Sequence, residues 1–262
     1  MADAVYEVTS VVQGKLLDYH AHSARLARSL AELGMRPPVS DEQLLDIHFR
    51  LISHNELEEG LVYLQVTRGE ADRDFAFTDD LEPTLVLFTQ TKALVQAPAA
   101  AVGLRVMSVD DIRWLRRDVK TVQLLAPSLA KSRAKRAGVD DAWMVDENRA
   151  VTEGTSNNAY IITHSGCIVT RHLSSSLLNG ITRASVLRLA AEENMQIEER
   201  PFTIAEAQAA AEAFCSSATN FVTPVVEIDG VCIRDGRPGP MTTRLRDIYI
   251  QDALATAITP CN

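Results

Sequence analysis

The chain has 262 residues, of which 46% are hydrophobic and 23% charged, and its formal net charge is −9 at pH 7. This length can form one large or two modest domains, and the acidic balance argues against a nucleic-acid-binding surface. No apolar run is long enough to span a membrane and no signal-peptide pattern begins the chain, so we expect a cytoplasmic protein. The four cysteines have no CxxC spacing, which indicates a reducing compartment and predicts no metal site.

The first part of the sequence alternates strand and helix patterns. Strands are predicted for three apolar stretches, at residues 5–12, 61–66 and 84–88. Between the first two stretches, leucines at helical spacing predict a helix that Gly34 ends. Ser40 with Gln43 forms a capping-box pattern that opens a second helix. We therefore expect a small N-terminal α/β domain over residues 1–93.

Residues 94–101 are small and mostly uncharged, and they are predicted to link this part to a larger domain of residues 102–262. That domain mixes short strands and helices, predicted at residues 127–137, 143–145, 160–163 and 167–170. Thr203 with Glu206 predicts an alanine-rich helix, after which Cys215 begins a hydroxyl-rich turn. Asp229-Gly230 predicts a two-residue hairpin. These patterns favour an α+β fold with two subdomains, and no GxGxxG fingerprint is present.

Two short segments, residues 117–121 and 151–157, supply one amine and one carboxylate that suit chemistry on a heteroaromatic ring. Only five of the 26 basic residues are lysines, and of these Lys120 alone precedes an apolar run that could desolvate its amine and lower its pKa. Taken alone, Lys120 fits any half-buried strand end equally well. Together, the order and spacing of the two segments resemble fold-type IV pyridoxal-phosphate enzymes, the D-amino-acid transaminase group of class IV aminotransferases.

This resemblance implies a two-domain fold of the D-amino-acid aminotransferase type, with pyridoxal 5'-phosphate as the cofactor. It implies that Lys120 carries the cofactor as a Schiff base and acts as the catalytic base. Glu153 is implied to face the pyridine nitrogen, where a carboxylate keeps the ring protonated and makes it an electron sink. The structural alternative for Glu153 is a solvent-exposed strand glutamate. Ser156 is implied to contact the cofactor phosphate.

Residues 180–183 precede a helix with an apolar face, and a helix N-terminus offers unpaired N–H groups and positive potential to a phosphate. An ordinary N-cap would have the same pattern. The sequence Gly-Ile-Thr-Arg is similar to the family's motif, which implies that Ile181 and Thr182 contact the phosphate. Leu178 matches the apolar residue that supports the pyridine ring from behind.

Further phosphate contacts are implied at two other places. Arg25, in residues 22–26, matches the family's H-x-x-R-L pattern, whose arginine grips the phosphate with its planar fork. The alternative is a surface helix arginine that pairs with an aspartate or a glutamate. Ser217, Ala218 and Thr219 match the loop that completes the phosphate site. Because Ala218 replaces a threonine, only its backbone N–H could serve, and we expect somewhat weaker cofactor binding.

The substrate side follows from a third segment. Tyr6 and Tyr63 match family tyrosines near the cofactor, and Arg73 matches the arginine that clamps the substrate carboxylate. Phe75 stands where the family usually has a histidine, which could favour larger apolar side chains or a different amine donor. Arg68 is interpreted as structural support for its loop.

The resemblance implies a transaminase that moves the amino group of a D-amino acid such as D-alanine to a 2-oxo acid such as 2-oxoglutarate or pyruvate. It also implies a homodimer with the site near the interface. The alternatives are a branched-chain or (R)-amine transaminase, an aminodeoxychorismate lyase, or a cofactor-binding protein inactivated by a shortened N-terminus. The family's VYEV motif follows Met1 almost at once, so either the first strands are lacking or the start codon is assigned too late. We expect the latter.

Overall fold

The computed structural model describes residues 3–78 and 80–259, and its backbone forms two compact units. The first unit contains the chain up to Leu94, the segment Val119–Gln123 and the residues from Thr256 onward. The second unit contains Val95–Asp118 and Leu124–Ala255. The expected α+β fold class is confirmed. Met1, on which the question of the start codon depends, lies outside the described residues, as does Cys261.

The first unit is built on an antiparallel sheet with the strand order β2-β1-β3-β4. Its strands are β1 (Ala4–Val12), β2 (Lys15–Leu16), β3 (Glu59–Thr67) and β4 (Thr84–Thr91). The predicted strands at 5–12, 61–66 and 84–88 are therefore confirmed, with longer boundaries. Because side chains alternate across a strand, neighbouring residues of β1 face opposite sides of this sheet.

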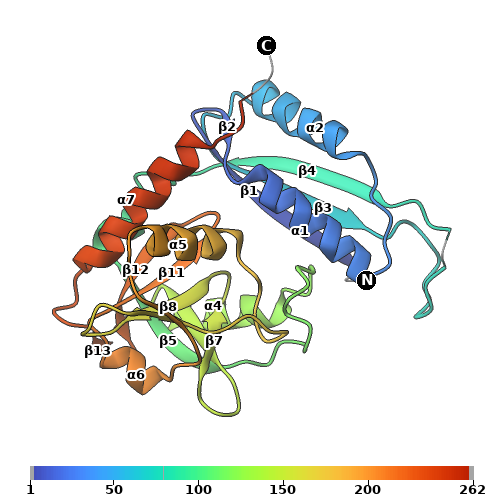
Figure 1. The fold of residues 1–262 in the computed structure, drawn as a ribbon. Coiled ribbons are helices and arrows are strands. Elements are labelled where there is room, and N and C mark those ends of the chain that lie inside the picture. The colour runs from blue at the N-terminus through green and yellow to red at the C-terminus, as the bar shows by residue number, and fades with distance from the viewer. Residues whose placement is uncertain (1–2, 79, 260–262) are drawn as a thin grey trace. The chain divides into compact units, whose positions relative to one another are not determined.

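Two helices cover one face of that sheet, α1 (Tyr19–Glu32) and α2 (Asp41–His54) (Figure 1). The capping box of α2 is confirmed, because the Ser40 side chain accepts from the Gln43 backbone and the Gln43 side chain accepts from the Ser40 backbone. The apolar sides of both helices meet the sheet in one buried cluster, formed by Val11, Leu16, Tyr19, Ile52, Leu57 and Val62. The side chains on the opposite face of the sheet therefore point away from both helices.

The second unit is built on a larger mixed sheet with the order β10-β9-β8-β11-β12-β5-β6-β7, and β13 adds to β12. The strands are β5 (Leu104–Asp110), β6 (Asp141–Val145), β7 (Val151–Gly154), β8 (Asn158–Ile162), β9 (Ile168–Thr170), β10 (Ile197–Glu199), β11 (Glu212–Ser217), β12 (Phe221–Ile228) and β13 (Val231–Cys232). A short turn joins β7 at one end of this order to β8 near the other, with Gly154 N donating to Asn157 O at 2.8 Å. The sheet therefore curls back on itself.

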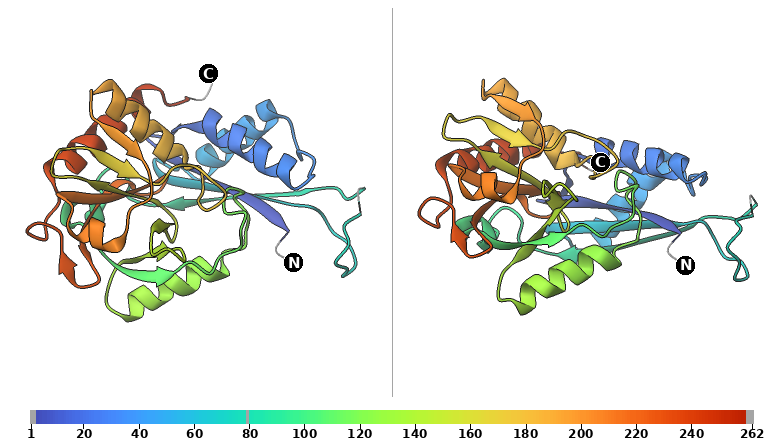
Figure 2. Two further views of the ribbon diagram at one scale, coloured as in Figure 1. Left: turned by 60° about the horizontal axis from the view of Figure 1, so that its bottom comes forward. Right: turned by 90° about the horizontal axis from the view of Figure 1, so that it is seen from below.

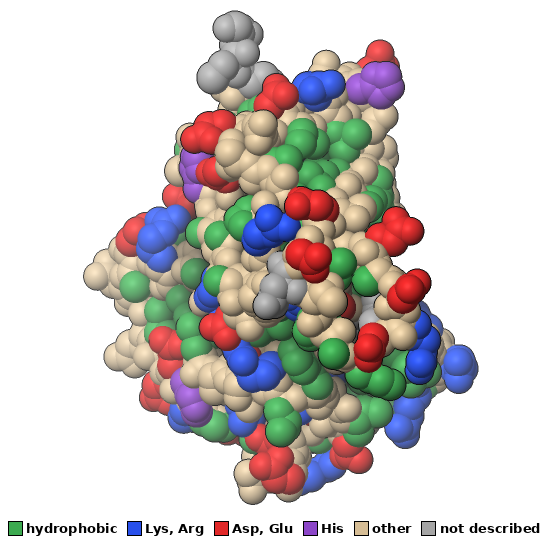
Figure 3. Space-filling view, turned by 90° about the vertical axis from the view of Figure 1, so that its right-hand side faces the viewer, with side chains coloured by type: hydrophobic (Ala, Val, Ile, Leu, Met, Phe, Trp, Pro, Cys, Tyr) green, Lys and Arg blue, Asp and Glu red, His purple; other side chains and the backbone are tan. Residues whose placement is uncertain are grey.

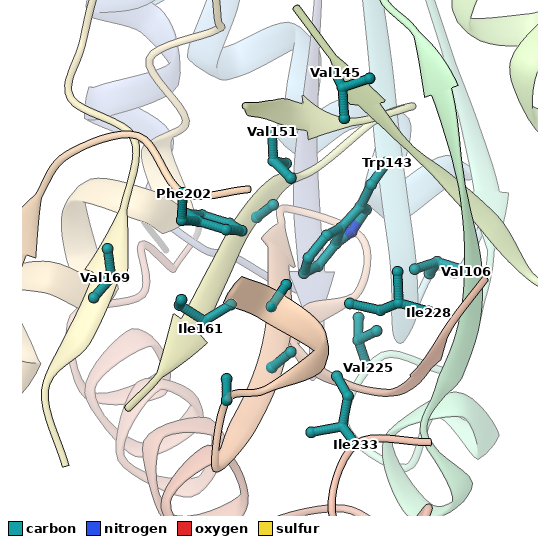
Figure 4. Packing of buried hydrophobic residues seen from close by; sticks show 14 of the residues in the cluster. Val106, Trp143, Val145, Val151, Ile161, Val169, Phe202, Val225, Ile228 and Ile233 are labelled. Atoms are coloured by element: carbon teal, nitrogen blue, oxygen red, sulfur yellow. The ribbon is translucent and has the colours of Figure 1, made fainter. Parts of the chain in front are cut away.

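The curl encloses a hydrophobic core around Trp143, which is fully buried and meets Phe202 edge to face at 6.0 Å between ring centroids (Figure 4). The surrounding helices are α3 (Pro98–Val102), α4 (Leu125–Arg136), α5 (Ile181–Glu192), α6 (Ile204–Gln208) and α7 (Pro240–Ala255). Figure 2 shows α4 lying along β5 and β6, where its buried Ala134 joins Ala142 and Met144 in a second cluster.

Local sequence signals are confirmed where the turn chemistry is strong. Asp229 and Gly230 both adopt positive φ, 50° and 78°, as the hairpin between β12 and β13 requires. The prediction that a hydroxyl-rich turn begins at Cys215 is wrong, because Cys215 to Ser217 lie in a strand. The alanine-rich helix α6 ends at Gln208, and Cys215 lies in β11, whose backbone pairs with both β8 and β12. Tertiary pairing and burial override local turn propensity there.

Acidic and basic side chains are interspersed with apolar ones on the face of the molecule that Figure 3 shows. Over residues 3–78 and 80–259, no helix combines the length and the apolar character needed to cross a membrane.

Candidate active site

The candidate site in the second unit is centred on the carboxylate of Glu153, which lies in β7 and is 4% exposed. Asn158 Nδ2 donates to Glu153 Oε2 at 3.1 Å, and the backbone N–H of Leu178 lies 3.3 and 3.2 Å from Oε1 and Oε2. Arg113 Nη1 donates to Oε1. The predicted alternative of a solvent-exposed glutamate is therefore excluded, because Glu153 is buried among hydrogen-bond donors.

Burial and charge act on Glu153 in opposite directions. Burial raises the pKa of Glu153, and the guanidinium of Arg113 together with the N–H of Leu178 opposes that rise. Arg113 is held in turn by Asp111, to which its Nε and Nη2 donate at 2.9 and 2.7 Å. A buried carboxyl with a raised pKa is suited to sharing a proton with a basic ring nitrogen.

Asn158 connects this carboxylate to the start of α5. Its Nδ2 also donates to the carbonyl of Leu178 at 3.0 Å. Its Oδ1 lies so close to Gly180 that a Cβ atom there would meet it at 2.1 Å, so a larger residue at Gly180 would displace the amide. On its other side, Asn158 is paired with Ser216 of β11. The amide side chain of Asn158 therefore lies between the carboxylate and the helix start, while its backbone pairs with β11.

The start of α5 and the end of β11 present groups that suit a phosphate. Gly180, the N-cap of α5, provides no side-chain cap, and no acidic residue lies in the first turn. Thr182 is buried in that turn. The hydroxyl of Ser217 is buried and has no hydrogen-bond partner among the described residues. The other residues predicted at the phosphate in this unit are partly buried, namely Ile181, Ala218 and Thr219, as is the predicted ring-supporting Leu178.

The residues of the second unit thus fit pyridoxal phosphate. A buried hydroxyl without a partner and a helix N-terminus without a side-chain cap both favour an anion. A buried carboxylate such as that of Glu153 can accept a hydrogen bond from a protonated ring nitrogen. Ser156, also predicted at the phosphate, is exposed in the turn between β7 and β8.

Lys120 belongs to the first unit, where the segment Val119–Gln123 runs antiparallel to the beginning of β1. The N–H of Tyr6 donates to the carbonyl of Lys120 at 3.0 Å, and the N–H of Val122 donates to that of Ala4 at 3.1 Å. These bonds place Lys120 Nζ 3.9 Å from the centroid of the Tyr6 ring, a cation–π arrangement.

The apolar run expected to desolvate Lys120 is only partly buried. Leu124 and Leu125, two members of that run, are 38% and 74% exposed. They lie at the start of α4, on the side of that helix that does not pack against the sheet. An aromatic ring, which periodicity did not reveal, is instead the close neighbour of the amine.

Tyr6 is part of an aromatic row on the sheet face opposite α1 and α2. Its ring stacks on that of Tyr63, with 5.6 Å between centroids, and Tyr63 stacks on Phe88 at 4.7 Å. The Tyr63 hydroxyl donates to Gln65 Oε1 at 2.9 Å. The two predicted substrate-binding tyrosines are therefore neighbours on the same face as Lys120.

Arg25 lies on α1 and is buried against the other face of the sheet. Its Nε and Nη2 each donate at 2.7 Å to the two oxygens of Glu7, and His22 Nδ1 lies 2.8 Å from Glu7 Oε2. The alternative is therefore borne out in part: Arg25 pairs with a glutamate, but it is buried and not on the surface. Its role at the phosphate stays a prediction.

Arg73 and Phe75 lie in the irregular segment between β3 and β4. Phe75 is 83% exposed, and the Arg73 guanidinium carbon is 5.4 Å from its ring centroid. Their role in carboxylate binding stays a prediction. The structural interpretation of Arg68 is confirmed, because its guanidinium donates to Asp3 at 2.6 Å and to the carbonyl of Leu33 at 2.8 Å.

Sequence reasoning missed Arg113 and gave Asn158 no role at the cofactor. Arg113 lies forty residues from Glu153, in a loop with several other arginines, and no local spacing distinguishes it. Asn158 could have been found, since it directly follows the run Thr152 to Asn157 that drew attention to Glu153.

The second unit thus combines a curled sheet, a buried carboxylate and a helix start suited to a phosphate. The sequence matches the class IV amino-transferase family over residues 4–228, and the chain belongs to that family. Class IV aminotransferases use pyridoxal phosphate.

Relatives and solved structures agree with this assignment. D-alanine aminotransferase from Staphylococcus aureus strain MSSA476 is 36% identical over 94% of this chain and 86% of its own length. The D-alanine aminotransferase of Bacillus licheniformis is 36% identical over 98% and 88%. In fold, the chain is similar to the branched-chain amino acid aminotransferase of Escherichia coli, with a TM-score of 0.86 and 21% identity over 96% of this chain and 85% of that one. It is also similar to the branched-chain amino acid aminotransferase of Thermobaculum terrenum in its pyridoxal-phosphate form, with a TM-score of 0.86 and 22% identity over 97% of this chain and 86% of that one.

Proposed function

We propose that this chain is a pyridoxal-phosphate-dependent aminotransferase that moves the amino group of a D-amino acid such as D-alanine to a 2-oxo acid such as 2-oxoglutarate or pyruvate. The observation that carries this proposal is Glu153, a buried carboxylate that shares Asn158 with the start of α5. The 36% identity to D-alanine aminotransferases over most of both chains supports the choice of D-amino acids.

In this proposal, the second unit binds the two polar ends of the cofactor. The backbone at Ile181 and Thr182, together with the Ser217 hydroxyl, binds the phosphate. Arg25, a residue of the first unit, is proposed as a further phosphate contact on the resemblance to the family. Glu153 holds a proton at the ring nitrogen, so bound pyridoxal phosphate supplies an electron sink for the charge that develops when the substrate α-proton leaves.

Lys120 is the proposed catalytic base, and its Nζ would carry the proton from the substrate Cα to C4′ of the cofactor; in the second half of the reaction, with the 2-oxo acid, it would move a proton from C4′ to Cα. Tyr6 orients that amine by its ring face, which lies 3.9 Å away. Tyr63 and Arg73 are proposed to bind the substrate carboxylate. Phe75 replaces the polar partner expected beside Arg73, so we expect weaker carboxylate binding and tolerance of apolar side chains.

We also propose a cytoplasmic homodimer. The dimer rests on the resemblance to the family. A reducing compartment is supported by the thiols of Cys167, Cys215 and Cys232, which are free in the part of the chain that the structure describes.

A donor screen on the purified enzyme tests the function. We expect turnover with D-alanine and 2-oxoglutarate or pyruvate, and Lys120→Ala should abolish it together with the absorbance of the covalently held cofactor. Activity on L-leucine with none on D-alanine would instead indicate a branched-chain aminotransferase. Bound cofactor that does not respond spectrally to any amino donor would indicate a binding protein without activity. A fully active Lys120→Ala enzyme would overturn the assignment of the base.

A further inference from the structure

Arg113 is the charged side chain closest to Glu153, and the proposed reaction does not yet use it. Its Nη1 donates to Glu153 Oε1, while Nε and Nη2 are taken by the two oxygens of Asp111 at 2.9 and 2.7 Å. The Arg113 side chain is 11% exposed, and the side chains of Glu153 and Asp111 are 5% and 0% exposed. The three charges are therefore largely shielded from solvent. Their interactions with one another are stronger in this environment than they would be in water.

Asp111 is fixed on several sides, so it holds Arg113 in one orientation. Its N–H donates to the carbonyl of Val145 at 2.8 Å, and it accepts from the Thr152 hydroxyl at 2.7 Å. Arg117 Nε lies 3.4 Å from the same carboxylate. Because a planar guanidinium bound at two nitrogens has little freedom left, its third nitrogen is directed at Glu153 before any cofactor binds.

We propose that Arg113 is a positioning residue that keeps Glu153 oriented and ionised, so that the proton shared with the cofactor stays on the ring nitrogen. This inference rests on the proposed function, in which Glu153 faces that nitrogen. In each hydrogen bond that the structure describes at the Glu153 carboxylate, the carboxylate is the acceptor. The donors are Arg113, Asn158 and the backbone N–H of Leu178. The Leu178 N–H is shared between both oxygens, at 3.3 and 3.2 Å, so three donors serve about four acceptor positions of the carboxylate and a ring N–H would be the fourth donor.

The charged groups around Glu153 explain the direction of the effect. Arg113 is in contact, Asp111 lies behind it, and Arg117 lies behind Asp111, whereas Asn158 and Leu178 contribute neutral donors. Burial raises the pKa of Glu153 and Arg113 opposes the rise. If Arg113 lost its charge, burial would act unopposed and the shared proton would move from the ring nitrogen to Glu153.

The test uses holoenzyme loaded with pyridoxal phosphate that carries nitrogen-15 in the ring, because the chemical shift of that nucleus reports its protonation. In Arg113→Met, we expect the resonance at neutral pH to move toward the value of unprotonated pyridine. We also expect the cofactor dissociation constant to rise about tenfold, as for loss of a charge-assisted hydrogen bond to the carboxylate. Arg113→Lys retains the charge and should keep the resonance closer to the wild-type position than Arg113→Met does.

The matched control is Arg149→Met, which removes an arginine from the exposed pair with Asp110, where the side chains are 67% and 81% exposed. It should leave the resonance unchanged. If Arg113→Met leaves the resonance at the wild-type position, or if Arg113→Lys moves it as far as Arg113→Met does, the proposed role is overturned.

Glu153→Gln separates this inference from the function on which it rests. If Glu153→Gln does not move the resonance, Glu153 does not face the ring and the proposed cofactor placement fails. If Glu153→Gln moves it and Arg113→Met does not, only the role of Arg113 fails. Thermal unfolding without cofactor identifies a variant that does not fold, in which case Arg113→Lys and Arg113→Gln provide the comparison.

Discussion

Arg25 and Glu7 form a buried two-pronged ion pair, with Nε and Nη2 of the arginine each 2.7 Å from a carboxylate oxygen. Burial alone raises the pKa of Glu7, but the charge and hydrogen bonds of Arg25, together with those of His22, outweigh burial. The pKa of Glu7 is lowered from 4.5 to about 2. The pair therefore joins α1 to β1 in a way that depends on pH.

The first prediction concerns stability in acid. The pKa of Glu7 is lower in the folded than in the unfolded protein. Its contribution to the free energy of unfolding is therefore fully present above pH 4.5 and is lost as the pH falls toward about 2. A lowering of this size corresponds to roughly 3 kcal/mol. Urea unfolding of wild type and Glu7→Gln, measured across this range, should show a stability difference at pH 7 that narrows in acid.

Asp46→Asn is the control for this prediction. Asp46 pairs with Arg50 at 3.7 Å with both side chains mostly exposed, so its loss should change stability by less than about 0.5 kcal/mol. If the difference in free energy of unfolding between wild type and Glu7→Gln stayed constant from neutral pH to pH 3, the lowered pKa of Glu7 would be contradicted.

The second prediction concerns the core of the curled sheet. Trp143 is 0% exposed and is surrounded by Phe202, Val225 and Ile228 (Figure 4). Trp143→Ala should lower the free energy of unfolding by about 3–5 kcal/mol, since it removes a large buried side chain and leaves a cavity. Leu129→Ala, on the exposed side of α4, should cost much less because its side chain is 53% exposed. Chemical denaturation of both variants compares them directly, and equal losses would argue against this core.

Local chemistry made part of this fold predictable. A helix start is specified by two residues, Ser40 and Gln43, and a hairpin by two others, Asp229 and Gly230. Both could be predicted without knowledge of the tertiary structure. Cys215 could not be placed in this way. Its segment follows an alanine-rich helix, and only pairing with β8 and β12 on both sides makes it a strand.

The same distinction applies to the site. Glu153 and Lys120 were found because short motifs surround them, but their surroundings depend on contacts distant in sequence. Lys120 lies beside Tyr6 because its segment pairs with β1 more than a hundred residues earlier, and Arg113 reaches Glu153 across forty residues. A pattern of neighbouring residues carries no information about such pairs.

The third prediction concerns the close approach of Gly180 to Asn158. The backbone of Gly180 has φ −68°, which any residue can adopt, so space and not backbone strain forbids a side chain. A Cβ atom at Gly180 would meet Asn158 Oδ1 at 2.1 Å. Gly180→Ala should therefore displace the amide from Glu153 and weaken cofactor binding by about tenfold or more, measured by fluorescence titration of the cofactor-free enzyme.

Gly138→Ala gives the opposite pattern and serves as the control. Gly138 has φ +78° and open space around its Cα, so alanine costs about 1 kcal/mol of backbone strain and nothing at the site. Its cofactor affinity should equal that of wild type. Equal affinity in Gly180→Ala would show that the Asn158 amide does not matter for binding.

The last prediction uses two adjacent serines with different partners. The Ser217 hydroxyl is buried without a hydrogen-bond partner in the described residues, whereas the Ser216 hydroxyl lies 2.8 Å from the buried hydroxyl of Tyr160. If Ser217 binds the cofactor phosphate, Ser217→Ala should weaken cofactor binding by roughly tenfold while the cofactor-free protein keeps or gains stability, because an unsatisfied polar group is removed.

Ser216→Ala should behave in the reverse way. It leaves the Tyr160 hydroxyl buried without its partner, so the cofactor-free protein should lose about 1–3 kcal/mol while its phosphate contacts remain. Thermal unfolding without cofactor and titration with cofactor separate the two effects. Loss of stability in Ser217→Ala with unchanged cofactor affinity would place the phosphate away from the end of β11, since a hydroxyl that binds it must contribute to affinity.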